Sequence, residues 1–102
     1  MDLLFEIICK LKKRIRISDE HWQHICKVKH LEVVDLEEEI KETLINPIEI
    51  KKSSSDKEVY LYYLKFKTNF LCVVTKHLNG NGFIITAYIT SKIKQGEIIW
   101  KQ

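Results

Sequence analysis

Glycine and proline are scarce in this chain, with three glycines and one proline among 102 residues, and there is no low-complexity tract. This composition excludes collagen-like, linker-like and largely disordered proteins. No apolar run approaches the roughly 20 residues that a membrane helix needs. The apolar start of the chain is interrupted by Asp2 and Glu6, and its basic residues follow the apolar stretch instead of preceding it. That order argues against a secretory signal.

The three cysteines, Cys9, Cys26 and Cys72, stand at irregular spacings that do not suit a disulfide framework. We therefore expect a protein of the reducing cytoplasm, with no membrane partner. The length of the chain predicts a single domain over residues 1–102.

Charge is unevenly distributed, although the formal net charge is only +3. Residues 1–17 and 51–102 are basic, whereas residues 18–50 are acidic. If the two basic segments are neighbours in the fold, they form a positive face suited to a polyanion. The alternative is an ordinary solvent-exposed surface, on which helices and strands differ in charge without any binding function.

The periodicity of apolar residues predicts strands at both ends of the chain and helices between them. Alternation over residues 3–17 predicts two short strands joined near Lys12-Lys13-Arg14, with a basic amphipathic helix as the competing interpretation. Ser18 is predicted to cap a first helix, and a second helix is predicted from Asp35, with Glu38 as its capping-box partner, to Asn46. Further strands are predicted at 48–50, 59–66, 70–75, 83–89 and 98–100.

Together these elements predict an α+β fold, in which two N-terminal helices pack on a curved antiparallel sheet of about four to five strands. Within the strand over 83–90, alternation predicts one face carrying Ile84, Thr86, Tyr88 and Thr90. Such a ladder of hydroxyl groups can bind phosphate oxygens or position a proton-transfer group. Threonine and tyrosine are also common on solvent-facing strands that have no function.

The register of the preceding hairpin decides which side chains meet this ladder. A two-residue turn at Asn79-Gly80 or Gly80-Asn81 places Thr75 and His77, with Val73, on the Thr86 face. A loop that is one residue longer places Lys76 there instead, so both arrangements stay open at this point.

Histidines are concentrated in the first helical region, at positions 21, 24 and 30. An imidazole can exchange protons near neutral pH. Cleavage of RNA without a metal needs such a group, together with cations that stabilise the phosphorane. The alternative is that these are ordinary surface histidines. Because His21, His24, Cys26 and His30 do not converge on one helical face, we predict no metal site.

Basic residues alternate with aromatic residues around Lys65 and Lys67. This composition suits base stacking and contacts with a nucleic-acid backbone. The alternative is a central strand with an aromatic core and solvent-facing lysines. The chain contains no glycine-rich phosphate loop, Gly-x-Ser-x-Gly or His-Glu-x-x-His pattern, so nucleotide-driven and serine-hydrolase chemistry have no support.

Several short motifs occur in an order that is similar to a known group of proteins. They are Ile15-Arg16-Ile17-Ser18, Trp22-Gln23-His24-Ile25, Lys29-His30-Leu31-Glu32, Glu42-Thr43-Leu44-Ile45-Asn46-Pro47, Tyr62-Tyr63, Val73-Val74-Thr75-Lys76, Gly82-Phe83-Ile84-Ile85-Thr86-Ala87-Tyr88 and Ile93-Lys94-Gln95-Gly96-Glu97-Ile98-Ile99-Trp100. This order resembles small phage-associated and prokaryotic proteins of the barnase, EndoU, colicin and RelE (BECR) superfamily of metal-independent ribonuclease toxins.

The resemblance implies a BECR-like or RelE-like α+β fold with an RNA-cleaving site on the open face of the sheet. The tryptophan-x-histidine element of the family falls on Trp22 and His24, and its threonine-alanine-tyrosine element falls on Thr86 and Tyr88. Its basic-histidine element falls on Lys29-His30, but the proline expected next is Leu31 here. The expectation for proton transfer therefore rests on His24.

The resulting hypothesis is a metal-independent endoribonuclease-like protein of toxin or phage-defence type, which cleaves RNA by attack of a 2′-hydroxyl on the adjacent phosphodiester. His24 would transfer the proton, and the hydroxyls of Thr86, Tyr88 and Thr90 would position or protonate the phosphate. The residues expected to bind RNA are Arg14, Arg16, Lys65, Lys67 and Lys76.

No cofactor is expected, and the expected partners are RNA, whether tRNA, mRNA or rRNA, and an antitoxin or immunity protein. The alternatives are a non-catalytic RNA- or protein-binding module of the same fold and a structural phage component.

Overall fold

The computed structural model describes residues 2–102, so the first residue of the predicted domain lies outside the described residues. Seven strands form one sheet in the order β1-β2-β6-β5-β4-β3-β7. Their bounds are β1 Leu3–Ile8, β2 Arg14–Ser18, β3 Glu49–Lys52, β4 Val59–Phe66, β5 Asn69–His77, β6 Asn81–Thr90 and β7 Glu97–Lys101. All neighbouring strands are antiparallel except β2 and β6, which are parallel.

The helical segments are short and lie between β2 and β3 in the sequence. They are α1 Asp19–His24, the π-helical segment η1 Ile25–Lys29, the 3-10 segment η2 Leu31–Val33 and α2 Glu37–Ile45. No helix within residues 2–102 is long and apolar enough to cross a membrane.

The predicted layout of the fold was wrong, although the broad α+β description holds. In place of four to five antiparallel strands, there is a mixed sheet of seven strands, and the helices follow β1 and β2, the two short strands predicted within residues 3–17. The difference comes from two pairings between distant segments, β2 with β6 and β3 with β7. Local periodicity marks a strand but carries no information about its partner.

The predicted start of the first helix and the predicted end of the second helix are confirmed. The Ser18 side chain caps α1 by accepting a hydrogen bond from the His21 amide at 3.1 Å, and α2 ends before Asn46-Pro47. The capping-box prediction at Glu38 was wrong, because the residue before α2 is Leu36, whose side chain makes no capping hydrogen bond.

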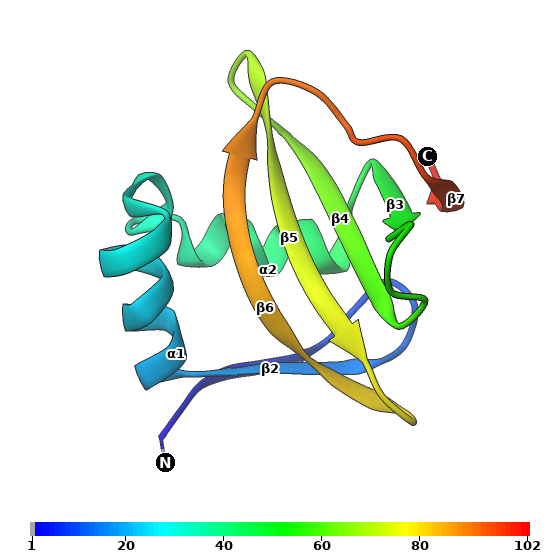
Figure 1. The fold of residues 1–102 in the computed structure, drawn as a ribbon. Coiled ribbons are helices and arrows are strands. Elements are labelled where there is room, and N and C mark those ends of the chain that lie inside the picture. The colour runs from blue at the N-terminus through cyan, green and yellow to red at the C-terminus, as the bar shows by residue number, and fades with distance from the viewer. Residues whose placement is uncertain (1) are drawn as a thin grey trace.

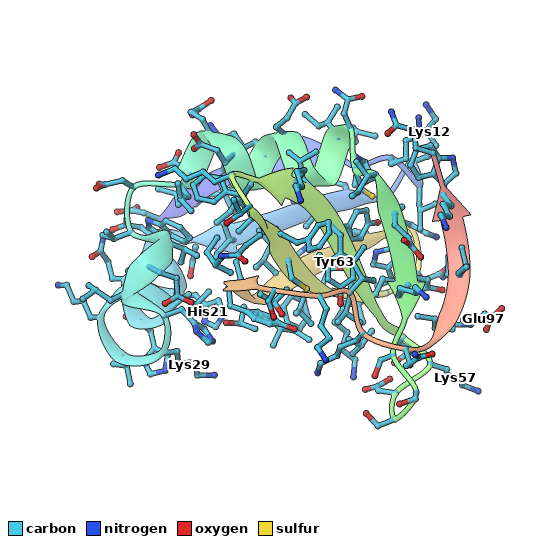
Figure 2. The ribbon with its side chains drawn as sticks, turned by 90° about the horizontal axis from the view of Figure 1, so that it is seen from above. Lys12, His21, Lys29, Lys57, Tyr63 and Glu97 are labelled. Atoms are coloured by element: carbon cyan, nitrogen blue, oxygen red, sulfur yellow. The ribbon has the colours of Figure 1, made fainter. Side chains whose placement is uncertain are left out.

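Apolar residues form two clusters of unequal size, one on each face of the sheet, and α2 covers one of these faces (Figure 1). The larger core lies on the face covered by α2, where Ile40 and Leu44 pack against Tyr62, Leu71 and Val73. In Figure 2 the β6–β7 crossover, residues 91–96, passes along the opposite face near Tyr63. We call this the outer face. Its smaller cluster of buried residues consists of Leu61, Tyr63 and Cys72.

Two hydrogen bonds hold the crossover on the outer face. The Lys94 amide donates to the Tyr63 hydroxyl at 3.2 Å, and the Lys51 ammonium donates to the Gly96 carbonyl at 3.4 Å. Lys51 is itself half of a largely buried ion pair with Glu49 at 3.4 Å. These contacts give the outer face a fixed border on the side of β3 and β7.

A β-bulge in β6 decides which side chains reach the outer face. Beyond the Asn79-Gly80 turn, Thr75 pairs with Ile84 but Val74 pairs with Thr86, so Ile85 is an extra residue on β6. The predicted common face of Ile84 and Thr86 is therefore wrong, because Ile84 joins the main core with Ala87. The extra residue has the effect that a hairpin loop one residue longer would have. It places Lys76, and not Thr75 or His77, on the face of Thr86.

Candidate active site

A cavity of about 370 Å³ opens on the outer face of the sheet. Its walls come from the segment between η1 and η2, from strands β4, β5 and β6, and from the loops after β3 and β6. The residues that line it are His30, Ser53, Val59, Leu61, Val74, Thr86, Tyr88 and Lys94. The walls are mostly apolar, and the few polar groups come from segments that are distant in sequence. This combination is typical of ligand sites.

His30 is the histidine that lies beside the hydroxyl ladder. Its ring stacks on the ring of Tyr88, with the ring centroids 5.5 Å apart and the planes inclined by 28°. Its Nδ1 atom is 3.4 Å from a carboxylate oxygen of Glu32. A carboxylate beside one imidazole nitrogen orients the ring and leaves the other nitrogen, Nε2, for proton transfer.

The segment that carries His30 is held against the free edge of β6. After Phe83, β6 has no strand neighbour on the side of β2, so its backbone groups need other partners. Glu32 accepts a hydrogen bond from the Ile89 amide at 3.5 Å, and His21 Nε2 lies 2.9 Å from the Ile85 carbonyl oxygen. Because a carbonyl can only accept, His21 Nε2 carries the hydrogen. These two bonds fix the position of His30 relative to Tyr88.

The three predicted hydroxyl groups differ in how they are used. Burial, and secondarily the neighbouring Cys72 thiol, raises the pKa of the Tyr88 phenol, so the phenol stays protonated and keeps its hydrogen for a hydrogen bond. The Thr86 hydroxyl is buried and finds no partner within residues 2–102. The Thr90 hydroxyl donates to the Lys92 carbonyl at 3.1 Å, which commits it to the turn after β6. Tyr88 is thus the best placed of the three.

Cys72, which pairs with Tyr88 across β5 and β6, adds no nucleophile to this face. Burial raises the pKa of its thiol to about 11, so the thiol is not ionised at neutral pH. Within residues 2–102, no group of three histidine, cysteine or acidic side chains could hold a metal ion.

The predicted RNA-binding cations lie around the cavity and not in it. Lys76 is on the outer face, but its ammonium is 3.3 Å from Asp56 and 3.8 Å from Glu58. Lys65 and Lys67 lie at the β4–β5 hairpin, over the rings of Phe70 and Phe66. The cation that lines the cavity is Lys94, for which no pattern in the sequence gave a signal.

Arg14 and Arg16 line a second, polar cavity of about 470 Å³ with Lys12 and the β5–β6 turn. Neither arginine forms an ion pair within the part of the chain from residue 2 onward. Their guanidinium groups are therefore available to an anion. Glu6 also lines this cavity and is the neighbour of Arg16 across β1 and β2.

His24 is exposed at the end of α1, where its ring stacks on that of His21 at 6.5 Å, and it does not line the cavity beside Tyr88. Helix α1 ends at His24, and the π-helical turn over Ile25–Lys29 carries the chain around to His30. The sequence signal for His30 was its spacing of two residues from Glu32, which brings a carboxylate to the imidazole.

No protein family, curated protein or solved structure matches the chain.

Proposed function

We propose that this protein is a metal-independent ribonuclease of toxin or phage-defence type that acts in the cytoplasm, with His30 in place of His24 as its proton-transfer group. The observation that carries the proposal is the stacking of His30 on Tyr88 in a cavity that Lys94 also lines. The order of motifs similar to that of BECR-type ribonucleases supports the same reaction class.

The reaction requires removal of a proton from the 2′-hydroxyl of RNA. His30 Nε2 would accept this proton while Glu32 holds the other ring nitrogen. The 2′-oxygen then bonds to phosphorus and the bond to the 5′-oxygen breaks, leaving a 2′,3′-cyclic phosphate and a 5′-hydroxyl. Because the cavity is open, a water molecule can supply the proton to the leaving oxygen.

Negative charge builds up on the phosphate oxygens during this displacement. The Tyr88 phenol can donate a hydrogen bond to one of these oxygens, and the Lys94 ammonium offsets the charge. The buried thiol of Cys72 and the turn-bound hydroxyl of Thr90 have no part in this scheme. The proposal thus assigns proton transfer to His30 and charge stabilisation to Tyr88 and Lys94.

The decisive experiment incubates the purified protein with RNA in the presence of EDTA and identifies the new termini. We expect cyclic phosphate termini from the unmodified protein, and a loss of roughly 100- to 10,000-fold in rate for His30→Gln. Tyr88→Phe should also lose activity. The matched control is His24→Gln, which changes an exposed histidine of the same region and should cleave normally.

Two results would overturn the proposal. If His24→Gln is inactive while His30→Gln cleaves, the proton-transfer assignment is wrong. If every variant, including the unmodified protein, binds RNA without cleaving it, the protein is not a nuclease and the alternative of an RNA-binding module stands. Thermal unfolding of each variant separates loss of chemistry from loss of fold.

A further inference from the structure

A third cavity, of about 350 Å³, lies where β2 and β6 separate. The two strands pair in parallel only as far as Arg16 and Phe83. Beyond that point β2 leads into α1 at the side of the sheet (Figure 1), and β6 continues toward its bulge at Ile85. The cavity is lined by Leu3, Arg16, Ile17, Ser18, His21, Phe83 and Ile84. It therefore combines largely apolar walls with three polar side chains.

Phe83 is unusual among the residues of this cavity because it is a large aromatic side chain that stays 37% exposed. Its neighbours across the sheet are Arg16 on β2 and Lys76 on β5. An aromatic ring flanked by cations on a strand surface suits the binding of single-stranded nucleic acids, since the ring can stack on a base and the cations can contact phosphates. Lys76 is partly neutralised by Asp56, so Arg16 is the main cation of this row.

The cavity is continuous with the basic surface of β2, since Arg16 lines both this cavity and the polar one that contains Lys12 and Arg14. It is also close to the reaction cavity. Phe83 pairs with Lys76 on β5, and Tyr88 pairs with Cys72. Because Lys76 and Cys72 are four residues apart on one strand, Phe83 and Tyr88 are separated by about 13 Å along the sheet. A single strand that passes over the outer face can contact both.

We infer that the cavity between β2 and β6 is a base-binding subsite for single-stranded RNA, in which a base stacks on Phe83 and the adjoining phosphate contacts Arg16. The inference rests on the proposed function, because it names the form of the substrate that the enzyme takes. The net charge of the chain is small, yet Arg14 and Arg16 form no ion pair within residues 2–102. A subsite for RNA explains these unpaired arginines and the exposed ring of Phe83. An RNA duplex would not fit, because its bases are already stacked and paired.

The test measures binding apart from cleavage. A single-stranded RNA oligonucleotide labelled with fluorescein is titrated with the His30→Gln protein, which still carries the subsite, and fluorescence anisotropy gives Kd. We expect Phe83→Leu in this background to raise Kd at least five-fold, because a base–aromatic stack is lost. Phe83→Trp should retain or improve affinity, and Arg16→Gln should raise Kd and weaken its salt dependence.

The matched control is Leu78→Ala. Leu78 is 40% exposed on the neighbouring turn, but it does not line the cavity. A fluorescent base analogue in the oligonucleotide provides a second readout, since stacking on Phe83 should quench it and Phe83→Leu should remove the quenching.

The inference is overturned if Phe83→Leu changes Kd less than two-fold, if no variant binds single-stranded RNA, or if a duplex of the same length binds as tightly. These outcomes are separate from failure of the proposed function. If the Phe83→Leu protein still cleaves RNA and its Kd is unchanged, the subsite is refuted but the nuclease is not. If binding depends on Phe83 but the unmodified protein does not cleave RNA, the nuclease is refuted but the subsite is not.

Discussion

His30 and Tyr88 are brought together from segments 58 positions apart in the chain, with their rings stacked at a centroid distance of 5.5 Å. The contact depends on Glu32, which approaches His30 through its carboxylate and also accepts the amide hydrogen of Ile89, the residue after Tyr88. One side chain thus positions the imidazole relative to the strand that carries the phenol.

Glu32 is predicted to be a positioning residue. Glu32→Gln keeps an acceptor for the Ile89 amide but removes the charge that orients His30, so we expect kcat to fall by up to about 100-fold while KM stays unchanged. Steady-state kinetics with a short RNA substrate measures both constants. Glu20→Gln, an exposed carboxylate in the first turn of α1, is the control and should change neither. A rise in KM alone would refute the positioning role.

The unpaired hydroxyl of Thr86 is predicted to cost stability. Thr86→Val replaces a buried hydroxyl that finds no partner within residues 2–102, so we expect the free energy of unfolding to rise by about 1 kcal/mol. Urea denaturation measures this change.

The same substitution at Thr75 provides the matched comparison. The buried Thr75 hydroxyl donates to the Tyr60 carbonyl at 3.2 Å, so Thr75→Val should lower the free energy of unfolding by about 1 kcal/mol. Equal effects of the two substitutions would show that the Thr86 hydroxyl has a partner in solution.

Stability is predicted to fall in mild acid because of His77. Burial, and secondarily the positive charge of Lys13, lowers the pKa of His77 from 6.5 to about 4. Its Nε2 is 3.1 Å from the Tyr62 hydroxyl, and its ring stacks on Tyr60 at 4.0 Å. The unfolded chain therefore binds a proton that the folded chain does not, so stability is complete above pH 6.5 and is lost progressively as the pH falls toward 4.

The measurement is the free energy of unfolding by urea at about pH 7 and about pH 5. His77→Gln, which can still form a hydrogen bond with Tyr62, should reduce the loss between these two conditions, whereas the exposed His24→Gln should not. If both variants lose stability as the unmodified protein does, His77 is not the group responsible.

Much of the local structure could be predicted from the sequence. The alternation of apolar residues indicated the strands at both ends of the chain, Ser18 indicated the start of α1, and Pro47 indicated the end of α2. These signals succeed because they depend on the conformational preferences of neighbouring residues. The capping box predicted at Glu38 did not form, because Leu36 and not Asp35 is the residue before α2.

The composition of the candidate site was also visible in the sequence: a histidine of the first helical region, hydroxyls on a late strand and basic residues around them. Which of these groups meet was decided by tertiary structure. The Ile85 bulge moved Lys76 onto the face of Thr86, the π-helical turn after His24 placed His30 beside Tyr88, and the pairing of β2 with β6 put Arg16 next to Phe83. Each of these outcomes depends on the energy of packing segments that are distant in sequence, which a local pattern of residue types does not record.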